Sequence, residues 1–217
     1  MERVNMAGAG GSVLSRLMDE FVIPVVRASE RRLARTAIDW LAEEGFRTFE
    51  ITMTVPEAIE LIEETTGRGL LVGAGTVLDA ATAERCIAAG ARYVVSPANL
   101  PAVAAACRGA GVVSMLGALT PTEVMAALAA GADAVKVFPA SSMGGPSHIK
   151  ALRAVFPNVL LVPTGGIDAE DIPAYRAAGA ALVGLGGKLV DETALLANDR
   201  ASIAAAARRV LQQIGRA

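Results

Sequence analysis

Histidine and cysteine are scarce in this sequence. Its 217 residues include one histidine, His148, and two cysteines, Cys86 and Cys107. No Cys-x-x-Cys motif is present, and a structural zinc site needs four such ligands at short spacings, so we expect no metal site. Both cysteines lie in alanine-rich helical patterns, where we expect them to pack as small apolar residues. So few cysteines are typical of a reducing compartment such as the cytoplasm.

Long apolar runs and blocks of like charge are also missing. No apolar run approaches the ~18 residues of a membrane span, and residues 1–12 lack the charged and apolar regions of a signal peptide. Twenty basic and 22 acidic residues give a net charge of −2, without a basic block. We therefore expect a cytoplasmic protein that binds neither nucleic acid nor a membrane.

The sequence does contain a regular alternation of short apolar runs and longer amphipathic segments. The runs predict strands at residues 21–26, 48–53, 70–73, 93–95, 111–115, 134–138, 159–163 and 181–184. The segments between them predict helices at residues 30–44, 55–64, 80–89, 101–108, 121–130, 147–155, 169–178 and 201–214. A short leading helix is expected at 13–20, and residues 1–12 are expected to be a flexible or additional N-terminal segment.

Strands that alternate with helices, and that are apolar almost throughout, favour a parallel sheet in an α/β protein. Eight strand–helix units without a linker predict a single (β/α)8 TIM barrel that occupies residues 1–217 as one domain. A doubly wound sheet is the alternative, but it would place a Gly-x-Gly-x-x-Gly turn after the first strand, and that turn is absent.

Lysine is another rare residue type, because only Lys136, Lys150 and Lys188 occur. Lys136 lies between two valines in the expected sixth strand, where burying an ammonium costs several kcal/mol. A desolvated, neutral amine is instead a nucleophile that attacks carbonyl groups. The alternative is a lysine at a strand end whose ammonium group reaches solvent.

The carboxyl ends of the strands of a (β/α)8 barrel converge on the face that carries the active site. Ionisable groups inside apolar strands then meet there, which favours Lys136 as the nucleophile and Glu50 as its proton shuttle. The alternative for Glu50 is a structural carboxylate paired with an arginine. The candidate substrate-binding residues at these ends are Arg27, Thr52, Thr54, Thr76, Pro97, Phe138 and Thr164.

Two glycine pairs, Gly165-Gly166 and Gly186-Gly187, follow the seventh and eighth predicted strands. Barrels of this kind often bind phosphate at these loops through backbone N–H groups, which glycine allows to approach closely. Lys188 would add a positive charge. The pairs therefore favour a phosphate site, and the alternative is that each is only a tight turn.

Several motifs together resemble a known family. They are Phe-Glu-Ile-Thr (49–52), Gly-Ala-Gly-Thr-Val (73–77), Ser-Pro (96–97), Val-Lys-Val-Phe-Pro-Ala (135–140), Pro-Thr-Gly-Gly-Ile (163–167) and Gly-Gly-Lys (186–188). From about Phe21 onward the chain resembles the 2-keto-3-deoxy-6-phosphogluconate / 4-hydroxy-2-oxoglutarate aldolases. The resemblance implies a class I lyase that acts on a small-molecule keto acid without a metal or other cofactor, usually as a homotrimer.

The resemblance also implies roles for individual residues. Lys136 matches the Schiff-base lysine, and Glu50 matches the group that transfers protons. Thr76 matches a residue near the pyruvyl carboxylate, whereas Pro97 and Phe138 match apolar walls. The glycines at 165, 166, 186 and 187 match the phosphate-binding loops.

The sequence departs from the family pattern at two positions. Gluconate-type members carry an arginine where Thr54 stands, and its carboxylate-binding role could pass to Arg27, which is similar in place to an arginine of phosphogalactonate-type relatives. The residue after the last glycine pair is often serine, and here it is Lys188. Both departures concern the substrate rather than the lyase chemistry.

We therefore predict cleavage of a 2-keto-3-deoxy-6-phospho sugar acid, of gluconate or galactonate type, to pyruvate and glyceraldehyde 3-phosphate. A close alternative is an aldolase for 4-hydroxy-2-oxoglutarate or for an unphosphorylated 2-keto-3-deoxy acid. A phosphosugar isomerase or epimerase barrel would share the phosphate loops but would need no amine nucleophile. A catalytically silent, ligand-binding barrel is the remaining alternative.

Overall fold

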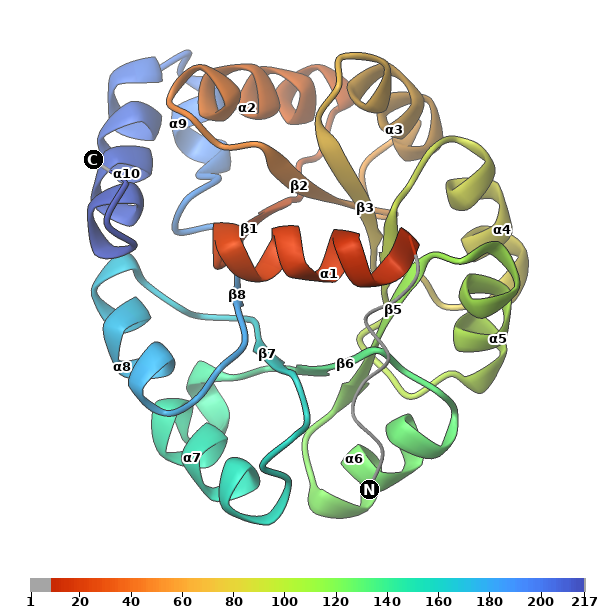
Figure 1. Cartoon of the computed structure of the whole chain (residues 1–217). Coiled ribbons are helices and arrows are strands. Elements are labelled where there is room, and N and C mark those ends of the chain that lie inside the picture. Colours follow the sequence, from red (N-terminus) through yellow and green to blue (C-terminus); the bar gives the residue numbers. More distant parts are fainter. Residues whose placement is uncertain (1–8, 217) are drawn as a thin grey trace.

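A computed structural model describes residues 9–216 of the chain, with side chains from residue 12 onward. Eight parallel strands follow the order β7-β6-β5-β4-β3-β2-β1-β8, and an isolated bridge between Thr164 and Gly184 joins the two outer strands. The strands therefore form the predicted barrel, with helices around its outside (Figure 1). The strands are β1 (Val22–Val26), β2 (Thr48–Thr52), β3 (Leu71–Gly75), β4 (Tyr93–Val95), β5 (Val113–Ala118), β6 (Ala134–Val137), β7 (Leu161–Pro163) and β8 (Val183–Leu185).

The helices follow the strands in turn, with two short 3-10 helices among them. The α-helices are α1 (Ala9–Glu20), α2 (Arg31–Glu43), α3 (Ala58–Gly67), α4 (Ala80–Ala88), α5 (Pro101–Ala110), α6 (Pro121–Ala129), α7 (Gly145–Val155), α8 (Ile172–Ala177), α9 (Glu192–Leu196) and α10 (Arg200–Gln213). The 3-10 helices are η1 (Ser141–Met143) and η2 (Ala169–Asp171). Among the described residues, no helix is long and apolar enough to cross a membrane.

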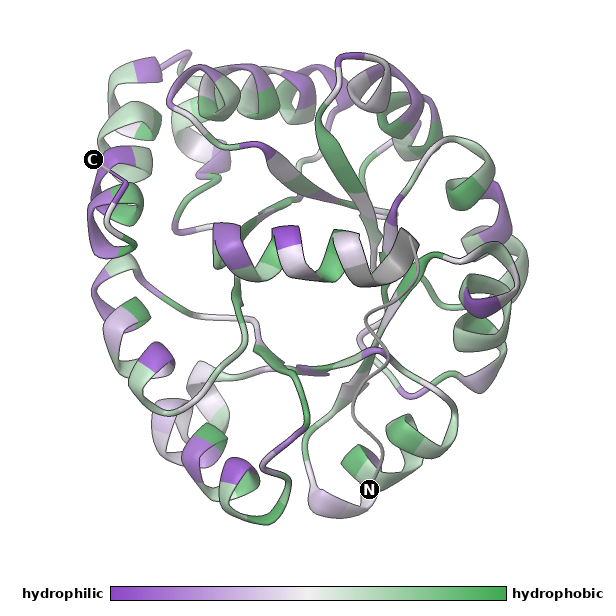
Figure 2. Ribbon diagram, viewed as in Figure 1, coloured by the Kyte–Doolittle hydropathy of each residue, from purple (hydrophilic) through white to green (hydrophobic). Residues whose placement is uncertain are grey.

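The apolar residues form two clusters, because alternate residues of a barrel strand face its inside and its outside. The larger cluster lies between the strands and the surrounding helices, whose outer surfaces carry most of the hydrophilic residues (Figure 2). The smaller cluster contains residues of the barrel interior such as Ile23 and Met115, together with Leu14 and Leu17 of α1. Helix α1 therefore packs against one end of the barrel and helps to fill it (Figure 1).

A buried tyrosine belongs to the apolar cluster inside the barrel. Tyr93 is fully buried, and its hydroxyl is hydrogen-bonded to Thr48 Oγ1 at 3.0 Å. A Cβ atom at Gly73 would lie only 2.1 Å from the Tyr93 ring, so glycine is required beside it. Burial raises the pKa of Tyr93 well above its ordinary value, which keeps the phenol neutral.

Several element boundaries differ from the sequence-based predictions. The helix after β2 begins at Ala58 rather than at residue 55, because Glu57 before it is in the left-handed region with φ of 54°. The helix predicted at 169–178 is divided into η2 and α8, while η1 and α9 were not predicted. The leading helix begins at Ala9, four residues before its predicted start, and residues 1–8 lie outside the described part of the chain.

Both cysteines are buried in the outer cluster, as their helical patterns predicted. Cys86 Sγ lies 3.4 Å from Met53 Sδ, and desolvation is the main cause that raises the pKa of Cys86 to about 11. Desolvation also raises the pKa of Cys107 to about 12. Both thiols are therefore protonated at neutral pH and poorly suited to nucleophilic chemistry.

Candidate active site

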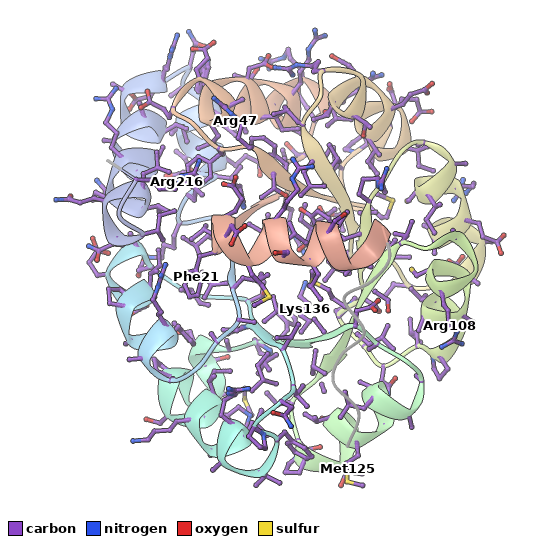
Figure 3. The ribbon with its side chains drawn as sticks, in the orientation of Figure 1. Phe21, Arg47, Arg108, Met125, Lys136 and Arg216 are labelled. Atoms are coloured by element: carbon purple, nitrogen blue, oxygen red, sulfur yellow. The ribbon has the colours of Figure 1, made fainter. Side chains whose placement is uncertain are left out.

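Two ionisable residues face each other inside the barrel. Lys136 of β6 and Glu50 of β2 have side chains only 6% and 4% exposed, and Lys136 Nζ lies 3.5 Å from Glu50 Oε1. The alternative in which Lys136 extends into solvent is therefore wrong, because its amine is enclosed and lies near the middle of the barrel (Figure 3). The alternative in which Glu50 pairs with an arginine is also wrong, since its ionic partner is Lys136.

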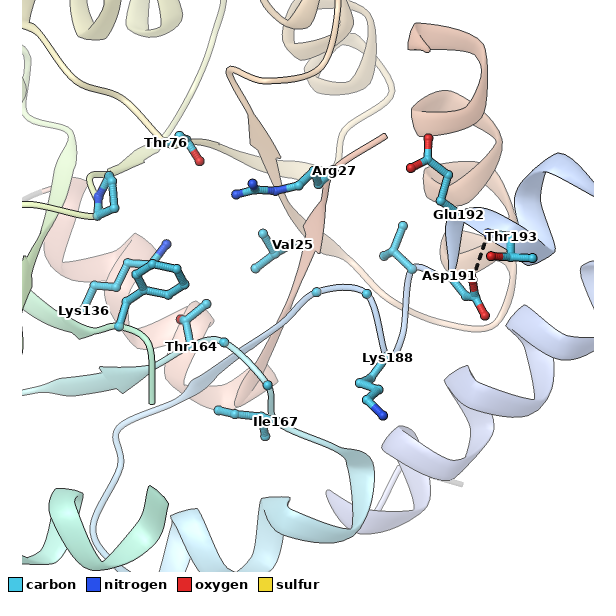
Figure 4. Close-up of a pocket in the computed structure, with 17 residues that line it drawn as sticks. Val25, Arg27, Thr76, Lys136, Thr164, Ile167, Lys188, Asp191, Glu192 and Thr193 are labelled. Carbon is cyan, nitrogen blue, oxygen red and sulfur yellow. Dashed lines mark hydrogen bonds between the residues drawn. The ribbon is translucent and has the colours of Figure 1, made fainter. Parts of the chain in front are cut away.

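Lys136 stands at the base of a cavity of about 670 Å³ at the carboxyl ends of the strands (Figure 4). Its Nζ lies 5.5 Å from the centre of the Phe138 ring, close enough for a weak cation–π attraction when the amine is charged. The cavity is lined by Val25, Arg27, Thr76, Pro97, Lys136, Phe138, Thr164, Gly165, Gly166, Ile167, Gly186, Gly187, Lys188, Val190, Asp191, Glu192 and Thr193. Most of the candidate site residues are therefore brought together.

Two of the candidate substrate-binding residues do not line this cavity. Thr52 is buried, and its Oγ1 donates a hydrogen bond to the Val26 carbonyl oxygen at 3.1 Å. Thr54 is exposed, and its hydroxyl is 2.8 Å from that of Thr52. A direct contact of either residue with substrate stays a prediction, and the hydrogen bonds give both threonines a role in fixing the end of β2.

Arg27 and Thr76 stand at the cavity wall on the loops after β1 and β3. The guanidinium of Arg27 points across the cavity towards Thr76 and Lys136 (Figure 4). Among residues 12–216 it has no carboxylate within ion-pair distance, so its charge is available to an anion. Thr76 has φ of 58°, a conformation that costs a β-branched residue energy and that is common at functional sites.

The two glycine pairs form adjacent parts of the cavity wall. Gly165 and Gly166 have φ of 97° and 72°, and a Cβ atom at either would lie within 3.0 Å of Phe138 or Ser141. Gly186 and Gly187 would meet no atom within 4 Å, so their backbone borders open space. The first pair is thus required by the fold, whereas the second leaves its backbone accessible to a ligand.

The residues after the second glycine pair carry most of the charge at this end of the cavity. Lys188 Nζ lies 3.6 Å from Asp168 Oδ2, and both side chains are largely exposed. Asp191 Oδ1 accepts a hydrogen bond from the Thr193 backbone N–H, which caps α9. Glu192 Oε1 accepts one from the backbone N–H of Ser29 at 2.6 Å, and hydrogen bonds with Ser29 lower the pKa of Glu192.

Sequence reasoning missed Asp191, Glu192 and Thr193 as cavity residues. A signal was present, because an aspartate followed at once by a glutamate is typical of a helix start. The five-residue length of α9 hid that signal.

Two polar residues outside the cavity serve the fold. The His148 ring Nε2 is hydrogen-bonded to the Leu119 carbonyl oxygen at 2.8 Å. Asp133 Oδ2 accepts hydrogen bonds from the backbone N–H and hydroxyl of Ser114, at the opposite end of the strands. Neither residue lines the cavity.

The barrel, the buried Lys136–Glu50 pair and the cavity above it define a (β/α)8 enzyme with an enclosed amine. Comparison with known proteins gives the family. The family model described as KDPG and KHG aldolase matches residues 13–206 of this chain. The chain is 40% identical to a protein from Rhizobium meliloti (strain 1021) named a probable 2-dehydro-3-deoxy-6-phosphogalactonate aldolase, over 79% of this chain and 82% of that protein.

Two further relatives agree with this match. A 2-dehydro-3-deoxy-phosphogluconate aldolase from Treponema pallidum (strain Nichols) is 36% identical over 89% of this chain and 93% of its own. A KDPG aldolase structure from Legionella pneumophila, with pyruvate captured as a covalent carbinolamine, has a TM-score of 0.82 and 30% identity, covering 91% of this chain and 97% of that one. The chain belongs to the KDPG and KHG aldolase family, and it is an aldolase, a carbon–carbon lyase.

Proposed function

We propose that this aldolase cleaves a 2-keto-3-deoxy-6-phospho sugar acid, of gluconate or galactonate type, to pyruvate and glyceraldehyde 3-phosphate. The observation that carries the proposal is the buried Lys136 amine, which lines the cavity and lies 3.5 Å from the carboxylate of Glu50, a buried residue behind the cavity lining. The names of the relatives from Rhizobium meliloti and Treponema pallidum support the two substrate types.

In the proposed mechanism, the ammonium group of Lys136 first passes a proton to the Glu50 carboxylate 3.5 Å away. The resulting amine attacks the C2 ketone and forms a carbinolamine. Glu50 gives a proton to the carbinolamine hydroxyl, which leaves as water, and an iminium ion remains. The 3.5 Å separation from Nζ suits this role, because a proton donor must act close to the nitrogen that carries the reacting carbon.

Cleavage follows from the iminium ion. The carboxylate of Glu50, directly or through a water molecule, takes the proton of the C4 hydroxyl. The C3–C4 bond breaks, the aldehyde leaves, and the bonding electrons move into the iminium as an enamine. Protonation at C3 and addition of water to the resulting iminium then release pyruvate and restore the amine.

The remaining cavity residues would bind the two ends of the substrate. Arg27 and Thr76 would hold the pyruvyl carboxylate, and Pro97 and Phe138 would form apolar walls beside the Schiff base. Thr164 lines the cavity and directly precedes Gly165, and it would contact the middle of the substrate. The terminal phosphate would meet the backbone of the glycine pairs and Lys188.

A substrate panel tests the proposal. Pyruvate release is measured from 2-keto-3-deoxy-6-phosphogluconate, from the corresponding phosphogalactonate, from both unphosphorylated acids and from 4-hydroxy-2-oxoglutarate. We expect the highest kcat/KM with a phosphorylated acid and loss of all activity in Lys136→Ala. Retained cleavage in Lys136→Ala, or a clear preference for an unphosphorylated acid, would contradict the proposal.

We further propose that the chain forms one domain over residues 1–217, assembles as a homotrimer and acts in the cytoplasm without a metal. The exposed Met125 and Leu128 on α6, 62% and 40% accessible, are compatible with a surface that another copy covers. Light scattering after size exclusion gives the number of copies, and unchanged activity after treatment with a chelator is the result expected for a metal-free reaction.

A further inference from the structure

Lys188 is the cavity cation nearest the glycine pairs, but it is not free. Its ammonium group is paired with Asp168, which lies outside the residues that line the cavity. Asp191 and Glu192, the two carboxylates of the lining, are engaged with backbone N–H groups. Figure 4 shows Lys188 turned away from Arg27 and Lys136.

The Lys188–Asp168 pair joins the two loops that would hold a phosphate group. Asp168 follows Gly165-Gly166 by two residues, and Lys188 follows Gly186-Gly187 directly. Lys188 lines the same cavity as both glycine pairs, so its ammonium group could turn towards a phosphate bound there. That phosphate would compete with the Asp168 carboxylate for the Lys188 ammonium group.

We propose that Asp168 is a specificity-determining residue, which competes with a phosphate group for Lys188 and so limits the preference for phosphorylated over unphosphorylated aldehydes. The inference rests on the proposed function. The 3.6 Å separation and side chains 63% and 45% exposed describe a weak, solvent-screened pair that breaks at low cost. A phosphate group carries nearly two negative charges and attracts Lys188 more strongly than one carboxylate does.

The condensation direction gives a matched pair of substrates. Pyruvate is combined with D-glyceraldehyde 3-phosphate or with D-glyceraldehyde, which differ only in the phosphate, and kcat/KM is measured for each aldehyde. Asp168→Asn keeps the shape of the side chain and its ability to cap η2, but removes the charge. We expect the ratio of the two kcat/KM values to rise about twofold to fivefold at low ionic strength, and the rise to shrink with added salt.

Two further variants isolate the cause. Asp39→Asn is the matched control, because it removes a carboxylate of similar exposure (38% against 45%) from an ion pair with Arg68 outside the barrel, and it should leave the ratio unchanged. In a Lys188→Met background the phosphate preference should be lower, and Asp168→Asn should then raise the ratio much less than it does in the parent. Asp168→Ser, which also caps a helix, replaces Asp168→Asn if that variant does not fold.

The outcomes separate this inference from the proposed function. Normal condensation by the parent with an unchanged ratio in Asp168→Asn overturns the inference alone. If Asp168→Asn raises the ratio of the two kcat/KM values equally in the parent and in the Lys188→Met background, the inference is also overturned, because Asp168 would then act on the phosphate by its own charge. Condensation of pyruvate with neither aldehyde overturns the proposed function and the inference together.

Discussion

The position of the Glu50 carboxylate depends on a missing side chain at Gly75. A Cβ atom at Gly75 would lie 2.1 Å from Glu50 Oε1, the oxygen that faces Lys136, and 2.6 Å from Cδ and Cγ. Ordinary contact begins at 3.4 Å, so in Gly75→Ala the oxygen must withdraw by about 1.3 Å. The backbone of Gly75 is not in the left-handed region, so backbone strain does not contribute to the effect of the substitution.

A displacement of about 1 Å in a catalytic group costs on the order of 100-fold in rate, and overpacking a core costs roughly 1–3 kcal/mol of stability. We therefore expect kcat of Gly75→Ala to fall about 100-fold and its free energy of unfolding to fall by about 1–3 kcal/mol. Steady-state kinetics and denaturant titration measure the two quantities. Gly109→Ala on α5, where an added Cβ meets no atom within 4 Å, is the control and should retain full activity.

A double-mutant cycle shows whether Glu50 is the cause. The three atoms nearest to the added Cβ all belong to Glu50, so Gly75→Ala should cost little stability in a Glu50→Ala background. An equal loss of stability in both backgrounds would refute the steric reasoning. Full kcat in Gly75→Ala would refute the claim that the gap places the carboxylate.

Three more predictions concern single contacts. Arg27→Ala should raise the KM for pyruvate in condensation by roughly 10-fold to 100-fold, the value of a hydrogen bond to a charged group, and an equal effect on a ketone without a carboxylate would contradict its assignment. Tyr93→Phe should lower the free energy of unfolding by about 1–3 kcal/mol, because it leaves the buried Thr48 hydroxyl without its hydrogen-bond partner. Adding Thr48→Val should recover most of the loss. Folding raises the thiol pKa of Cys86 from 9.0 to about 11 and that of Cys107 from 9.0 to about 12. Above pH of about 9 the unfolded chain therefore loses protons that the folded chain keeps, so the free energy of unfolding should fall as the pH rises. Denaturant titration at several alkaline pH values should show a smaller fall in Cys86→Ala/Cys107→Ala, and an equal fall would contradict the role of the thiols.

The barrel and its central pair could be predicted from sequence because both follow from short-range rules. Apolar runs at regular intervals set the eight strands, and the convergence of strand ends then placed Lys136 near Glu50. Their direct 3.5 Å contact required the register of β2 and β6, which sequence periodicity does not give.

Other parts of the site depend on loop conformations and side-chain directions that the sequence pattern does not show. Thr54 follows β2 closely, yet its hydroxyl turns to Thr52 rather than to the cavity. Lys188 was expected beside a phosphate, but its partner Asp168 lies on another loop. Pro56 suggested an earlier start for α3, and the left-handed Glu57 delays it. In each case the sequence is compatible with several loop conformations, and the folded structure adopts one of them.

The central claim is that Lys136 forms a covalent Schiff base with pyruvate. Borohydride reduction in the presence of pyruvate, followed by peptide mapping in a mass spectrometer, tests it directly. We expect one reduced pyruvyl adduct, located on Lys136, absent without pyruvate and absent from Lys136→Ala. An unmodified Lys136 in active enzyme, or an adduct on Lys150 or Lys188 instead, would contradict it.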